Sequence, residues 1–121
     1  MDIIESVKQA IIKQAQAEAP IESCGYLLGT DDTVTENYPM TNIDHSEEHF
    51  SFDPREQFAA LKYARQKGLR ILANWHSHPA SPRLANDPTI RYAILSLQDG
   101  DIRLNSFKII NREIIDKEIH I

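Results

Sequence analysis

The chain has few of the features that mark disulfide-rich, membrane or nucleic-acid-binding proteins. Cys24 is the single cysteine among 121 residues, which excludes an internal disulfide framework and a cysteine-rich zinc knuckle. We therefore expect a cytoplasmic protein. No apolar run is long enough to span a membrane, and the N-terminal segment lacks the basic flank of a signal peptide. The net charge of -5 argues against a broad phosphate-binding surface, so we expect neither nucleic acid nor a membrane as a partner.

The remaining composition is that of an ordinary globular domain. Hydrophobic residues make up 41% and charged residues 26% of the chain. A chain of 121 residues can bury one core but is too short for two. We therefore expect a single domain over residues 1–121.

Three segments have apolar residues at helical spacing. They cover residues 2 to about 18, residues 54 to 67 and residues 88 to about 97, and Pro20 stops the first of them. The spacing of the third segment is set by Ile90, Ala93, Ile94 and Leu97.

The second of these segments has the clearest limits. Asp53 is the expected N-cap, Pro54 the first helical residue and Gly68 the end of the helix. We expect one apolar face to pack on the core, and it consists of Phe58, Leu61 and Ala64.

Strands are predicted between and after these helices. Residues 24–29, 33–40 and 69–78 have the apolar or alternating character of strands, and the tail predicts two strands joined by a turn at residues 111–112. Residues 41–53 form a long polar loop, a kind of segment that is often functional. The order α-β-β-α-β-α-β-β predicts an α/β (α+β) fold, in which a mixed central sheet is flanked by about three helices.

A histidine pair at the end of the third strand indicates a metal site. Residues two apart on a strand face the same side, so His76 and His78 can offer two imidazoles to one ion. A zinc site needs a third protein ligand, and Asp87 is the nearest carboxylate after the pair. Aspartate directly before Pro88 is also a strong helix start, so Asp87 is either a metal ligand or an N-cap.

Two residues next to the predicted site residues are expected to be structural. Trp75 alternates with His76 and should face the core on the other side of the strand. Cys24 is expected to be a small buried residue rather than a nucleophile, because no basic neighbour in the sequence would lower its pKa.

The motifs resemble those of a known family. "WHSHP" at 75–79, "APIESCGYLLG" at 19–29 and the helix-to-strand segment from 50 to 79 resemble the JAMM/MPN+ (Mov34/MPN/PAD-1) metalloprotease family. The resemblance covers nearly the whole chain in order. The length leaves no room for the insertions of eukaryotic members, so the small prokaryotic type is the closer comparison. The resemblance implies a JAMM/MPN domain, whose fold is cytidine-deaminase-like.

The resemblance also implies roles for three residues. Glu22 matches the catalytic acid/base, and His76 and His78 match two zinc ligands. From spacing alone, Glu22 would be expected to be an exposed charge before a strand. The family match instead places it beside the metal.

Two positions depart from the family pattern. Asn86 stands where the family has serine, and Thr89 stands where it has its ligand aspartate. An asparagine N–H can still support an oxyanion, but a threonine hydroxyl is a poor zinc ligand. Asp87, displaced by two residues from the family position, is the candidate replacement.

The implied activity is that of a zinc-dependent hydrolase. The resemblance implies a metallopeptidase that hydrolyses a peptide or isopeptide bond near the C-terminal tail of a ubiquitin-like or sulfur-carrier protein. The alternative is a catalytically impaired MPN-type protein-binding module with a degenerate metal site, favoured by Thr89. A cytidine-deaminase-type enzyme would need a Pro-Cys-x-x-Cys run, which one cysteine cannot supply.

Overall fold

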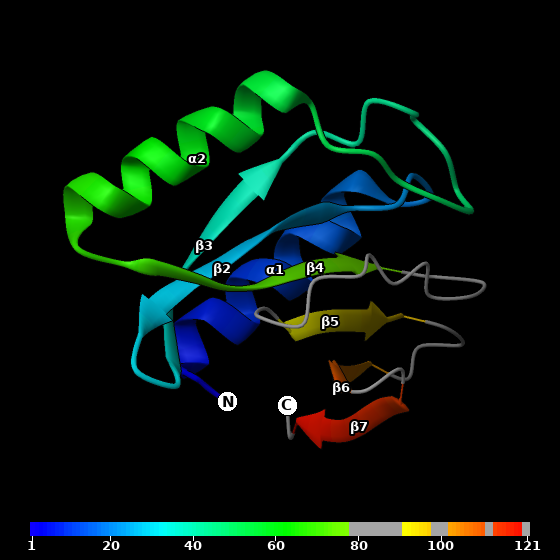
Figure 1. Ribbon diagram of the computed structural model, residues 1–121. Helices are drawn as coiled ribbons and strands as arrows, with labels where there is room; N and C mark the ends of the chain where they lie inside the picture. The colour runs from blue at the N-terminus through cyan, green and yellow to red at the C-terminus, as the bar shows by residue number, and fades with distance from the viewer. Residues whose placement is uncertain (78–90, 98–101, 111–112, 120–121) are drawn as a thin grey trace.

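The computed structural model describes residues 1–77, 91–97, 102–110 and 113–119 (Figure 1). The described residues form two helices, α1 (Glu5–Glu18) and α2 (Pro54–Lys67). The strands are β1 (Asp2–Ile3), β2 (Cys24–Thr30), β3 (Thr33–Met40), β4 (Arg70–Ser77), β5 (Arg91–Ser96), β6 (Arg103–Ile110) and β7 (Glu113–Ile119).

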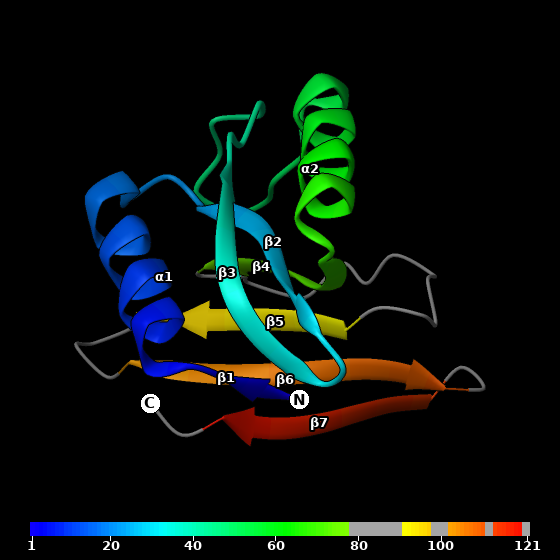
Figure 2. The ribbon, with the colours of Figure 1, turned by 90° about the vertical axis from the view of Figure 1, so that its left-hand side faces the viewer.

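All seven strands belong to one mixed sheet. Their order is β1-β3-β2-β4-β5-β6-β7. β1 pairs with β3, and β4 with β5, in parallel, whereas the other neighbours are antiparallel. Figure 2 shows that the sheet is strongly curled, since β2 and β3 rise steeply while β5, β6 and β7 run across the view. The predicted α+β class with a mixed sheet is confirmed, as are both strands of the tail.

The two helices cover opposite faces of the sheet (Figure 2). On one face α1 buries Val7, Ile11 and Ala15 against a cluster that includes Leu27 and Trp75. On the other face α2 packs on a cluster formed by alternate residues of β2, together with residues of the following strands and loop. The expectation that Trp75 faces the core is confirmed, because its side chain is fully buried. Neither described helix is long and apolar enough to cross a membrane.

The ends of α2 agree with the sequence, but its buried face does not. The Asp53 side chain accepts a hydrogen bond from the Arg55 N–H, and Gly68 ends the helix in the left-handed conformation. The predicted core face is wrong in part, because Phe58 is 71% and Leu61 52% exposed. Small side chains face the sheet instead; they are Ala60 and Ala64.

The predicted third helix is wrong over residues 91–96. This segment is β5, which runs parallel to β4 and pairs Ala93 with Trp75. Ala93, Ile94 and Leu95 are consecutive and all buried. A strand buried on both faces gives a continuous apolar run, which periodicity cannot distinguish from a buried helix. The structure thus has two helices in its described part, where the sequence predicted about three.

Candidate functional site

Glu22 is buried at the entrance to β2. Its side chain is 1% exposed, so the sequence-only expectation of an exposed charge is wrong. Its backbone N–H donates to the Ser46 carbonyl at 2.9 Å. The next residue extends the β2–β4 pairing, because the Ser23 N–H donates to Ser77 Oγ at 2.9 Å and the Ser77 N–H donates to the Ser23 carbonyl at 3.0 Å. These bonds fix Glu22 beside the end of β4.

His76 reaches the same point from β4. It pairs with Cys24 across the β2–β4 ladder and is 2% exposed. Alternation along β4 sends Trp75 to the α1 side and His76 to the other side. Glu22, two residues before Cys24, lies with His76 on this second side.

The two side chains approach one another without forming a hydrogen bond. Glu22 Oε1 lies 3.9 Å from His76 Nε2, which is longer than a hydrogen bond. Among the described residues, Glu22 Oε2 and His76 Nδ1 are buried and have no hydrogen-bond partner. Buried polar atoms normally have partners, so these two mark a site that can accept a further group.

Burial shifts the pKa values of Glu22 and His76 in opposite directions. Loss of hydration raises the pKa of Glu22 to about 7, although the nearby His49 lowers it in part. Loss of hydration lowers the pKa of His76 to about 4. His76 is therefore a neutral imidazole near pH 7, the form that binds zinc, and Glu22 is close to half protonated. The neutral imidazole suits one zinc ligand, and the carboxyl group beside it suits proton transfer.

A loop covers the imidazole. Residues 42–52, here called the 42–52 loop, are closed at the base by a β-bridge between Asn42 and Phe52. Phe50 stacks on His76, with ring centroids 4.6 Å apart and planes at 28°. Phe50 also packs edge-on against Phe52, which contacts Tyr26 of β2. The loop thus lies against the sheet and keeps water from one side of His76.

The other predicted site residues lie beyond this part of the structure. His78, Asn86, Asp87 and Thr89 fall outside the described residues. Within the described ranges, no three His, Cys, Asp or Glu residues come together as a metal site. The structure therefore brings Glu22 and His76 together and leaves the predicted ligands His78 and Asp87 untested.

Three other residues of the loop region have different roles. Asp53 caps α2. His49 is 48% exposed at its side chain and its Nδ1 lies 3.0 Å from Asp44 Oδ2. His45 is exposed and has a φ of 47°. Both histidine side chains are therefore exposed to solvent.

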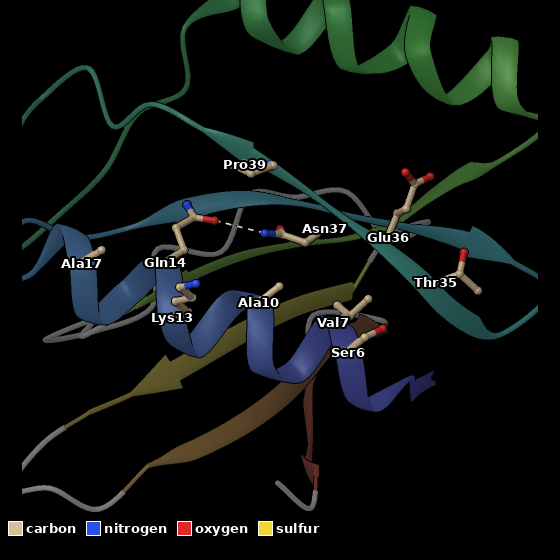
Figure 3. A pocket seen from close by; sticks show the side chains of 10 residues that line it. All are labelled: Ser6, Val7, Ala10, Lys13, Gln14, Ala17, Thr35, Glu36, Asn37 and Pro39. Atoms are coloured by element: carbon tan, nitrogen blue, oxygen red, sulfur yellow. Dashed lines mark hydrogen bonds between the residues drawn. The ribbon is translucent and has the colours of Figure 1, made fainter.

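A groove of about 520 Å³ lies elsewhere, between α1 and β3 (Figure 3). Its lining includes Gln14 and Asn37, joined by a hydrogen bond of 3.0 Å. Asn37 in turn accepts a hydrogen bond of 2.9 Å from Trp75 Nε1. The groove therefore belongs to the α1 side of the sheet, whereas Glu22 and His76 face the other side.

Sequence reasoning missed two residues near the candidate site. Phe50 and Phe52 are two phenylalanines in an otherwise polar segment, and this apolar content is the one signal in the sequence that points to Phe50. Asn42 gave no signal, because an asparagine in a polar loop is unremarkable. Its buried position becomes visible only when the loop is folded onto the sheet.

Comparison with known proteins identifies a matching family and several similar proteins. Residues 5–84 match the model of a family described as prokaryotic homologs of the JAB domain. A protein of Pyrococcus furiosus named desampylase is 34% identical over 61% of this chain, and the match spans 52% of that relative. A Mycobacterium tuberculosis protein named CysO-cysteine peptidase is 24% identical over 93% of this chain and 84% of its own length.

Two solved structures share the fold. The solution structure of a Desulfitobacterium hafniense protein matches with a TM-score of 0.85 and 37% identity, and covers 98% of this chain and 90% of that chain. The crystal structure of a JAB1/MPN domain protein from Archaeoglobus fulgidus matches with a TM-score of 0.55 and 19% identity over 89% of each chain. The second likeness concerns the fold alone.

Proposed function

We propose that this chain, which belongs to the family of prokaryotic homologs of the JAB domain, is a zinc-dependent metallopeptidase. The observation that carries the proposal is the buried pair, with Glu22 Oε1 3.9 Å from a neutral His76. A carboxyl group beside a ligand-ready imidazole is the arrangement that metal-assisted hydrolysis needs.

In this proposal His76 and His78 hold the metal, with Asp87 as the third ligand. His76 suits the role because burial keeps its imidazole uncharged and its lone pair available. When bound, zinc supplies Lewis acidity, which polarises a carbonyl and makes attack by water possible near neutral pH.

Glu22 is the proposed proton carrier. Its pKa of about 7 lets one oxygen accept a proton from the attacking water and then release it to the leaving amine. The hydrogen bonds on its backbone N–H and carbonyl hold it beside His76. Asn86 would donate its side-chain N–H to the developing oxyanion.

The proposed substrate is a peptide or isopeptide bond near the C-terminal tail of a ubiquitin-like or sulfur-carrier protein. The names of two relatives, a desampylase and a CysO-cysteine peptidase, support this class. A flexible C-terminal tail can reach a buried carboxyl group that a folded surface cannot.

The activity test uses a sulfur-carrier protein extended by a short peptide after its terminal di-glycine. We expect cleavage after the di-glycine with zinc, and a loss of about 100-fold or more in Glu22→Gln, since proton transfer contributes about 10²–10⁴-fold. Product masses would be read by mass spectrometry. Cleavage at an unchanged rate by Glu22→Gln would overturn the proposed role of Glu22.

Calorimetry separates the enzyme from its alternative, a catalytically impaired binding module. Zinc is titrated into chelator-stripped wild type and Asp87→Ala. Tight binding that Asp87→Ala weakens supports the ligand set. Tight binding unaffected by the substitution removes Asp87 from it, and the absence of micromolar binding favours the binding module suggested by Thr89.

A further inference from the structure

Asn42 differs from every other residue of its loop. It is 5% exposed, and it is the one buried residue of the range 41–53, all of which the structure describes. A buried carboxamide must have its donors and acceptors satisfied, or it costs the fold stability. The partners of this carboxamide therefore show what it holds in place.

The amide nitrogen is directed at three carbonyl groups. Asn42 Nδ2 donates to the Glu22 carbonyl at 3.0 Å and to the His49 carbonyl at 3.0 Å. The Ser46 carbonyl lies at 3.4 Å and shares the donor. One side chain thus connects the backbone of Glu22, the proposed proton carrier, to two points of the 42–52 loop.

The amide oxygen holds the two arms of the loop. Asn42 Oδ1 accepts from the Asp44 N–H at 3.1 Å and from the Ser51 N–H at 3.3 Å. Together with the three carbonyls, these contacts use both N–H groups and both lone pairs of the carboxamide. Ser51 follows Phe50, so the same side chain fixes the backbone that stacks Phe50 on His76.

We propose that Asn42 is the positioning residue of the site. It sets Glu22 and the Phe50–His76 stack relative to one another from a single buried amide. The bearing on catalysis rests on the proposed function, but the geometry can be measured without any activity. The Asn42 side chain hydrogen-bonds to backbone groups of Glu22 and of the 42–52 loop, so it acts on the site through the backbone and Phe50.

Asn42→Asp tests the donor half of this network. The substitution keeps the size and leaves an oxygen for the Asp44 and Ser51 N–H groups, but it turns a second oxygen toward three carbonyls. Asn37→Asp is the matched control. It breaks the same kind of bond, from Nδ2 to Gln14, on the α1 side of the sheet.

The first readout is the ¹H and ¹³C chemical shifts of the His76 ring in metal-free protein. Phe50 stacked at 4.6 Å shifts these signals upfield, and Phe50→Leu defines complete loss of the effect. We expect Asn42→Asp to move the signals toward the Phe50→Leu values and Asn37→Asp to leave them in place. A wild-type His76 spectrum in Asn42→Asp, or an equal change in Asn37→Asp, would overturn the proposal.

The second readout is zinc affinity by calorimetry. Partners that orient ligands typically contribute about 10–100-fold, so we expect a loss of that size in Asn42→Asp and less than about threefold in Asn37→Asp. If wild type binds no zinc, the proposed function fails while the His76 spectrum still decides the role of Asn42.

Hydrogen exchange in the wild-type protein covers the case in which Asn42→Asp does not fold. The Asp44 and Ser51 amides lie in a loop, yet both donate to Asn42 Oδ1. We expect both to exchange at least about tenfold more slowly than an unstructured peptide. Exchange at the unstructured rate would show that the carboxamide does not hold the loop.

Discussion

At the scale of single residues, the site holds a carboxyl group and an imidazole that burial keeps neutral. The pKa of Glu22 rises from 4.5 to about 7, and that of His76 falls from 6.5 to about 4. The groups facing Glu22 are His76 from β4 and His49 from the 42–52 loop. These two opposite shifts have opposite effects on stability as the pH changes.

The first prediction concerns that pH dependence in chelator-stripped protein. Folded Glu22 holds its proton more tightly than the unfolded chain, so its contribution is present below pH 4.5 and is lost as pH rises through about 7. Folded His76 releases its proton more easily, so its contribution is present above pH 6.5 and is lost as pH falls through about 4. Between pH 4.5 and 6.5 the two slopes oppose each other in wild type.

Glu22→Gln removes one of these slopes. Its unfolding free energy, measured by urea denaturation, should rise by about 2–3 kcal/mol from pH 4.5 to 6.5, while that of wild type changes much less. A flat profile in Glu22→Gln would contradict the burial of a neutral His76.

A second prediction concerns Gly25, where three strands meet. A Cβ at this position would lie 2.7 Å from Trp75 Nε1 and 2.7 Å from the Tyr38 carbonyl oxygen. Gly25→Ala should therefore lower the unfolding free energy by about 1–3 kcal/mol, as overpacking does. The control is Gly68→Asn, because a Cβ at position 68 would face open space and asparagine tolerates the φ of 69° there. Equal stability of Gly25→Ala and wild type would refute the close contact.

At the scale of elements, the limits of α2 could be predicted from the sequence, whereas the packing of the elements against one another could not. Asp53, Pro54 and Gly68 gave the limits of α2 because caps depend on neighbouring residues alone. The prediction of the buried face of α2 was wrong because the curled sheet approaches this helix at its alanines, Ala60 and Ala64. The helix prediction around Ala93 was wrong because a strand buried on both faces has a continuous apolar run, which periodicity cannot distinguish from a buried helix.

The third prediction tests which face of α2 is buried. Ala60→Leu should cost about 1–3 kcal/mol of unfolding free energy, because its side chain has no exposed surface. Phe58→Gln should stay within about 0.5 kcal/mol of wild type, since Phe58 is 71% exposed. Thermal and urea denaturation would compare the two variants. The reverse order would support the face that the sequence predicted.

For the candidate site, the sequence indicated two of the side chains that meet there but not the loop residues around them. Motif resemblance paired Glu22 with His76, and the structure places them 3.9 Å apart. Phe50 and Asn42 could not be predicted, because their contacts arise when the 42–52 loop closes onto distant strands.

At the scale of the whole molecule, the central strands separate two hydrophobic clusters on opposite faces of the sheet. Cys24 lies in β2, between β3 and β4, and has no exposed surface. Burial, with the charges of nearby glutamates, raises the pKa of its thiol to about 12. The expectation that Cys24 is a buried residue is confirmed.

The fourth prediction uses this thiol to follow global unfolding. A thiol reagent at neutral pH should label Cys24 only when β2 leaves the sheet, because the thiolate is rare and unreachable in the folded protein. The labelling rate should follow urea-induced unfolding measured by circular dichroism. Complete labelling within minutes without denaturant would mean that β2 opens locally.

The alternation of β4 has a practical consequence. Trp75 is the single tryptophan of the chain. It directly precedes His76, and its side chain is fully buried. Its indole N–H is held by Asn37 inside the α1-side core, so its fluorescence arises from one well-defined environment. A change at the imidazole that shifts this strand would alter that emission, which makes the native chain its own optical sensor for events on the opposite face of the sheet.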